Sequence, residues 1–200
     1  MAKKIPNTIS CGPLGAHRIA MSTTTVQKHC LETPLLKWAS ALGWAGVLPF
    51  VVLLALGWSG PQDALLRPFA LGLLSAYAAL IAAFLGAIHW GVALARPLEN
   101  WRLQRAALLW GVTPGLIALG CLVMPRAWGL LALALVMLLA RAMDGLLWPG
   151  YARAAHVAEC PDAERWSRLA AAWLQLRTRL TAAVVLCLAA GWVSLHFQAS

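Results

Sequence analysis

Long stretches without a charged side chain dominate this sequence. Uncharged runs of 25, 28 and 20 residues cover 38–62, 68–95 and 106–125. A helix rises about 1.5 Å per residue, so runs of this length can cross the roughly 30 Å hydrocarbon core of a bilayer. The chain has 200 residues, of which 61% are hydrophobic and 12% charged, and a soluble domain of that size could not bury so much apolar surface. The sequence therefore predicts an integral membrane protein.

The fourth span is not evident from its uncharged run alone. The uncharged run 127–140 has only 14 residues, about 21 Å of helix, so the fourth span must continue past Arg141 and Asp144 to Trp148. Pro49 lies within the first span and should kink it, leaving a carbonyl for a neighbouring helix or water to satisfy. We expect an all-α fold, a bundle of about five transmembrane helices. The predicted spans are about 38–58, 70–95, 105–125, 127–148 and 179–197.

An amphipathic helix is expected before the last span, over about 161–176. Trp166, Leu169, Trp173 and Leu176 recur at helical spacing, and arginines occupy another face. This pattern is typical of a helix lying in the membrane interface on the cytoplasmic side. A solvated helical lead-in to the last span is the alternative.

The distribution of Lys and Arg predicts the orientation. Alternate segments between the spans carry 14 of these residues on one side and 2 on the other, so the basic side is expected to be cytoplasmic. Residues 1–37 would form a flexible cytoplasmic tail, with Met21 an equally acceptable start, and 38–200 a single transmembrane domain with a periplasmic carboxyl end. Topology alone accounts for the net charge of +9, so no nucleic-acid partner is expected.

The second span contains a histidine on a face of small residues. Counting from Ser75, the steps to Ala79, Ala82, Gly86 and His89 are 4, 3, 4 and 3 residues, which keeps all five on one side of a helix. Small residues allow two helices to approach closely. Ser75, Ala79, Ala82 and Gly86 are therefore predicted helix-packing residues, and His89 should point into the bundle.

Three other polar residues should lie at the depth of His89: Thr113 in the third span, and Arg141 and Asp144 in the fourth. Ionisable residues within a membrane often mark functional sites. Arg141 and Asp144 are three residues apart and could pair on one helix face. We hypothesise that His89 contacts the fourth span near them, forming a polar intramembrane site. Alternatively, His89 makes a single hydrogen bond to a neighbouring helix and Arg141 extends toward the interface.

No catalytic, cofactor or metal motif is recognisable. The five cysteines are scattered without ligand spacing. No second histidine lies at the depth of His89, which disfavours haem. Phosphate-binding loops, zinc-protease motifs and nucleophile elbows are missing from the sequence. We therefore expect no catalytic residue, no metal and no cofactor.

Three segments carry a resemblance to a known family. They are Pro49-Phe50, the stretch Phe84-Leu85-Gly86-Ala87-Ile88-His89-Trp90-Gly91, and Leu174 to Thr181. Over roughly 35–195 the chain resembles the transmembrane protein 69-like family, domain of unknown function 3429. These are small multi-helix proteins of bacterial inner membranes, with mitochondrial relatives. The resemblance implies architecture and a bacterial inner membrane, with the mitochondrial inner membrane as the alternative, and it implies no activity or cofactor.

Two classes of function remain. The first is a non-enzymatic structural or assembly component of a membrane complex, whose partners would be the lipid bilayer and other membrane protein subunits. The second is a small carrier or channel with a cytoplasmic-side polar site around His89, Arg141 and Asp144. A carrier needs a continuous polar route across the membrane, and the sequence supplies only one end of such a route, which favours the first class.

Overall fold

A computed structural model describes residues 36–58, 65–95, 100–157 and 163–197. The chain divides into two compact units, 1–41 and 42–200. Only 36–41 of the first unit are described, and they are helical. The account below concerns the second unit.

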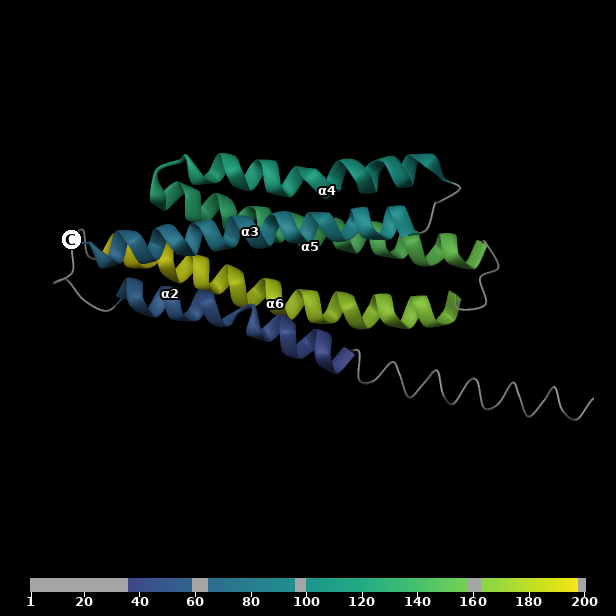
Figure 1. Cartoon of the computed structure of the whole chain (residues 1–200), viewed down its shortest axis with the longest axis horizontal. Helices are drawn as coiled ribbons and strands as arrows, with labels where there is room; N and C mark the ends of the chain where they lie inside the picture. Colours follow the sequence, from purple (N-terminus) through teal and green to yellow (C-terminus); the bar gives the residue numbers. More distant parts are fainter. Residues whose placement is uncertain (1–35, 59–64, 96–99, 158–162, 198–200) are drawn as a thin grey trace, which may run out of the picture. The chain divides into compact units, whose positions relative to one another are not determined.

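The second unit is built from helices, and the described part of the chain contains no strand (Figure 1). Five helices in the structure are long and apolar enough to cross a membrane, which confirms the predicted all-α fold and its five candidate spans. The candidate spans are Leu36–Trp58, Leu66–Leu94, Trp101–Leu122, Arg126–Tyr151 and Arg168–His196. The helices are α2 (Leu48–Trp58), α3 (Leu66–Ala95), α4 (Trp101–Leu122), α5 (Arg126–Val157) and α6 (Ala163–Phe197).

The first candidate span is interrupted next to its proline. A turn at 46–47 precedes α2, in which Pro49 is the second residue. Proline has no backbone N–H, so the helical hydrogen bonds cannot continue through this point. The Tyr77 hydroxyl of α3 donates to the Gly46 carbonyl over 3.0 Å. The interruption lies where the kink was predicted, and the carbonyl that α3 satisfies belongs to the turn.

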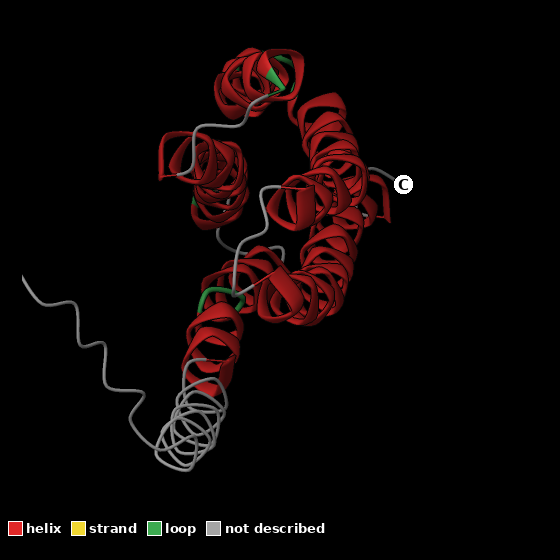
Figure 2. Ribbon diagram, turned by 90° about the vertical axis from the view of Figure 1, so that its right-hand side faces the viewer, coloured by secondary structure: helices red, strands yellow, loops and turns green. Residues whose placement is uncertain are grey.

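Helix α3 occupies the centre of the unit and contacts α2, α4, α5 and α6. Helices α3 to α6 run side by side with alternating direction, as Figure 1 shows from the side and Figure 2 along the helices. This arrangement follows from short connections, because such connections between long helices force antiparallel neighbours.

Two separate clusters of buried apolar side chains hold the helices together. The large cluster draws on all five helices, whereas the small cluster draws on α3 to α6 only. The members of the large cluster are Val47, Phe50, Leu71, Leu74, Ala78, Ala79, Ala82, Ala118, Cys121, Leu130, Leu133, Ala134, Val136, Met137, Val184, Cys187 and Leu188. The members of the small cluster are Ala93, Ala107, Leu147, Trp148, Tyr151 and Ala170.

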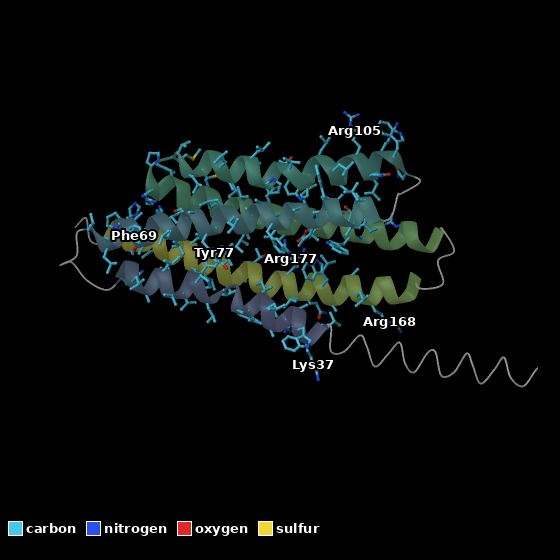
Figure 3. The ribbon with its side chains drawn as sticks, viewed as in Figure 1. Lys37, Phe69, Tyr77, Arg105, Arg168 and Arg177 are labelled. Atoms are coloured by element: carbon cyan, nitrogen blue, oxygen red, sulfur yellow. The ribbon has the colours of Figure 1, made fainter. Side chains whose placement is uncertain are left out.

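Arginines lie toward both ends of the helices, and Arg177 lies between the ends (Figure 3). Arg105 and Arg168 lie toward the end where the small cluster is found, and Phe69 lies toward the opposite end (Figure 3). At that opposite end Arg67 donates to the Ser194 carbonyl of α6, and we call it the Arg67 end and the other the Arg105 end. Alternate connections therefore meet at the same end, as the charge pattern requires.

Helix α6 is longer than the sequence suggested. It runs without interruption through the expected amphipathic segment and the expected last span, and only 158–162 separate it from α5. The count of 14 Lys and Arg residues on one side includes Arg141 and Arg177, which lie within α5 and α6. Setting these two aside still leaves an imbalance of 12 to 2 in Lys and Arg.

Candidate functional site

The imidazole of His89 is completely buried, with 0% of the residue exposed. It lies near the carboxyl end of α3, and both of its nitrogens have partners on α5. The Nε2 atom is 2.9 Å from Oδ1 of Asp144, and Nδ1 is 3.2 Å from the Tyr151 hydroxyl oxygen. Asp144 and Tyr151 are seven residues apart, which is two helical turns, so both face α3.

The carboxylate of Asp144 is held from a second side by α6. Its Oδ2 atom accepts hydrogen bonds from Nε and Nη2 of Arg177 at 2.8 and 2.6 Å. Asp144 is 2% exposed and Arg177 3%. His89, Asp144, Arg177 and Tyr151, which we call the polar network, thus join α3, α5 and α6.

Charge and hydrogen bonding together determine how the protons are arranged. The carboxylate of Asp144, which is paired with Arg177, can only accept hydrogen bonds. Nε2 then carries the hydrogen and donates to Asp144, and Nδ1 accepts from Tyr151. Both nitrogens of His89 and both carboxylate oxygens of Asp144 therefore have partners.

The hypothesis about the fourth span is correct for His89 and Asp144, which are in direct contact. It is wrong for the pairing of Arg141 with Asp144. The Nε atom of Arg141 instead donates to Thr178 Oγ1 of α6 at 2.8 Å, and Arg141 is partly exposed whereas Asp144 is buried. Thr113 is not part of the polar network either, since its hydroxyl donates to the Leu109 carbonyl within α4.

Sequence reasoning missed Tyr151 and Arg177. Both fall in the segment interpreted as a cytoplasmic loop and amphipathic helix, where the sequence pattern predicts that an arginine is one of several solvated charges. One signal was available: Arg177 is three residues from Leu174 and Leu180, on the same side of a helix as these apolar residues. An arginine at that spacing indicates a buried partner.

The predicted packing face of α3 is buried along its length, and it positions His89. Ser75, Ala79, Ala82 and Gly86 are all buried. A Cβ atom on Gly86 would lie 2.6 Å from the Gly111 carbonyl oxygen of α4, so the two backbones are in direct contact there. Only glycine permits this approach, which places the end of α3 firmly against α4.

Aromatic rings surround the polar network on the side of the small cluster. The Trp148 ring centroid lies 6.4 Å from that of His89, 5.8 Å from Tyr151 and 6.2 Å from Trp173. Trp148 is 8% exposed, and its buried Nε1–H has no acceptor within the described part of the chain. Among the described residues, it is the buried donor beside the polar network that is left unpaired.

The order of groups resembles a general-base unit, because a carboxylate orients a histidine that accepts a proton from a hydroxyl. Here, however, the hydroxyl belongs to Tyr151, which is 7% exposed and points inward. Little of Tyr151 is accessible from outside the bundle. The residues described contain no group of three His, Cys, Asp or Glu side chains that could hold a metal ion.

A protein family described as "Protein of unknown function (DUF3429)" matches residues 35–193. The chain belongs to this family. The match confirms the resemblance to domain of unknown function 3429 and covers every member of the polar network, but it carries no activity. No curated protein and no solved structure matches the chain.

Proposed function

We propose that this DUF3429 protein is a non-enzymatic membrane component that helps to assemble or stabilise a larger membrane complex. The observation that supports this proposal most strongly is the closed polar network. Its four side chains are 0 to 7% exposed and satisfy one another across three helices. Such a network favours a fixed helix arrangement over a site that exchanges a substrate.

The outward surface fits the same proposal. Large apolar side chains lie exposed along the spans, for example Leu116 and Leu119 on α4 and Leu135 on α5, each more than 60% exposed. Lipid covers such surfaces in an isolated protein, and another membrane subunit can replace that lipid through van der Waals packing. A rigid interior and a wide apolar exterior are suited to a subunit or an assembly partner.

A carrier or channel is the second candidate function. It is favoured by the position of His89, Asp144 and Arg177 inside candidate spans, where ionisable groups commonly serve transport. The route would have to continue to the Arg67 end, and the large cluster that lies there is apolar. The carrier therefore ranks below the assembly component.

Purification of the full chain from its native membrane in a mild detergent tests the proposal. We expect it to migrate on native gels above the mass of a monomer, with one or more membrane proteins in fixed stoichiometry. Reconstitution of the purified chain alone in vesicles containing a pH-sensitive dye is the companion measurement. Proton or ion flux by the lone chain, together with the absence of any stoichiometric partner, would contradict the proposal and support the carrier.

For orientation, we propose that the Arg105 end faces the cytoplasm of a bacterium, or the matrix if the membrane is mitochondrial. The 12 to 2 imbalance in Lys and Arg supports this orientation. A single cysteine introduced at Leu65 should react with a membrane-impermeant thiol reagent added from outside. Labelling at this position from the cytoplasmic side alone would reverse the proposed orientation.

A further inference from the structure

The charged groups at the level of His89 do not balance. Arg141 and Arg177 contribute two guanidinium groups, and Asp144 is the sole acid among residues whose side chains the structure describes. Arg177 and His89 already occupy both oxygens of Asp144. Arg141 keeps its charge under all ordinary conditions, so one positive charge on the lipid-facing side of α5 lacks a counter-charge from these residues.

The side chain of Arg141 extends toward the Arg105 end. Side chains on a helix normally lean toward its amino end, which for α5 is the Arg67 end. The Nη1 atom nevertheless lies 3.4 Å from where a Cβ on Gly145 would be, one turn toward the carboxyl end. Thr178 of α6 holds Nε in this position, and the partly exposed guanidinium lies beside the contact between α5 and α6.

The depth of the guanidinium matches the edge of a bilayer. Gly145 lies 19 residues beyond Arg126 on α5, which is about 28 Å of helix. Arg126 lies against Gly72 near the start of α3, at the Arg67 end. With Arg126 at one edge of a hydrocarbon core of roughly 30 Å, the guanidinium of Arg141 reaches the opposite edge. Lipid phosphates begin at that level.

We propose that Arg141 and Thr178 form a subsite for the phosphate of an anionic phospholipid, at the surface where α5 meets α6. The two Nη groups donate to the phosphate oxygens, a geometry that suits a planar guanidinium. The lipid charge balances the excess positive charge. This inference is independent of the assembly function, since a lone subunit and a carrier could both bind such a lipid.

The test compares two lipids added to the purified full chain in detergent. Phosphatidylglycerol should raise the midpoint of thermal unfolding, and phosphatidylcholine, which has no net charge, should raise it much less. Arg141→Gln should weaken the apparent affinity for phosphatidylglycerol about tenfold, as expected for loss of a charge-assisted pair of hydrogen bonds. Native mass spectrometry should show the same loss of retained lipid.

Arg153→Gln is the matched control, because Arg153 is exposed on the same helix three turns further along. It should leave lipid binding unchanged. Thr178→Val and Arg141→Lys provide the test if Arg141→Gln fails to fold. Thr178→Val should weaken binding because Nε loses its acceptor, and Arg141→Lys should keep only part of it.

Three results would overturn the proposal. Equal affinity of the natural chain and Arg141→Gln would show that Arg141 does not hold the lipid. Equal losses in Arg141→Gln and Arg153→Gln would indicate diffuse attraction to a basic surface. Loss of a bound membrane protein in Arg141→Gln with unchanged lipid binding would assign the counter-charge to an acidic side chain of that partner.

Discussion

The two buried clusters of this protein hold its helices together by different means. The large cluster consists mainly of aliphatic and small side chains, which pack without directional bonds. The small cluster contains Trp148 and Tyr151, and the polar network lies beside it. Apolar packing tolerates small sliding of one helix along another, whereas a hydrogen-bonded ion pair does not. We infer that the polar network sets the register of α3, α5 and α6, and that the large cluster supplies bulk packing.

The largest expected effect comes from removing the cation of the polar network. Arg177→Met leaves Asp144 buried without its guanidinium partner, which should lower the free energy of unfolding by about 3–5 kcal/mol. Arg179→Met is the control, because Arg179 is exposed two residues away, and it should change that free energy by less than about 0.5 kcal/mol. Thermal unfolding in detergent measures both.

A double variant sharpens the same comparison. Arg177→Met combined with Asp144→Leu removes both charges and should recover part of the lost stability, since replacing a buried pair by apolar residues is often neutral. The contrary result is a double variant that loses as much free energy of unfolding as the two single variants together. In that case the two side chains act independently and do not set the register together.

The next effect concerns the contact between α3 and α4. Gly86→Ala places a Cβ 2.6 Å from the Gly111 carbonyl oxygen and should cost about 1–3 kcal/mol, because the backbones must separate. Gly91→Ala is the matched control, since a Cβ there meets nothing within 4 Å. Equal unfolding midpoints for the two variants would show that the close approach of α3 and α4 is unimportant for stability.

A pair of aromatic substitutions distinguishes paired from unpaired polar groups in the small cluster. Tyr151→Phe leaves Nδ1 of His89 buried without a donor and should cost about 1–3 kcal/mol. Trp148→Phe removes a buried donor that has no acceptor, so the loss of ring volume should be offset and the change should stay below about 1 kcal/mol. Chemical unfolding of the two variants side by side checks this order, and the reverse order would refute the assigned hydrogen bonding.

The smallest effect tests the hydrogen bond that Tyr77 of α3 makes to the interrupted first span. Tyr77→Phe removes the hydrogen bond to the Gly46 carbonyl but keeps the ring that lies 4.9 Å from Phe50. The expected cost is about 0.5–1.5 kcal/mol. A cost above that of Tyr151→Phe would mean that polar contacts govern the large cluster as well.

Hydropathy and spacing predict most of this fold. The uncharged runs identify the spans, and the regular spacing of Ser75 to Gly86 identifies the buried face of α3 because helical geometry is periodic. The same periodicity places His89 inside and Asp144 within reach. These features depend on local geometry, which a single sequence contains.

The partners within the polar network depend on rotation of one helix against another, which local periodicity does not specify. Two arginines were available to Asp144, one three residues away on its own helix and one 33 residues away on α6. Proximity in sequence favoured Arg141, and packing selected Arg177. Asp144 packs against His89 of α3 and Arg177 of α6, which fixes the rotation of α5 about its axis. This rotation directs Arg141 to Thr178 and away from Asp144.

The ion pair between α5 and α6 also has a consequence for how the chain enters its membrane. Burying an arginine inside a helix bundle is unfavourable unless an acid is already there, and α6 is made last, after Asp144 has been placed. The final helix can therefore be stably inserted only once the preceding ones have assembled. A ribosome that stops before residue 163 would leave the carboxylate of Asp144 without Arg177, and quality-control proteases of the membrane could recognise such an incomplete bundle.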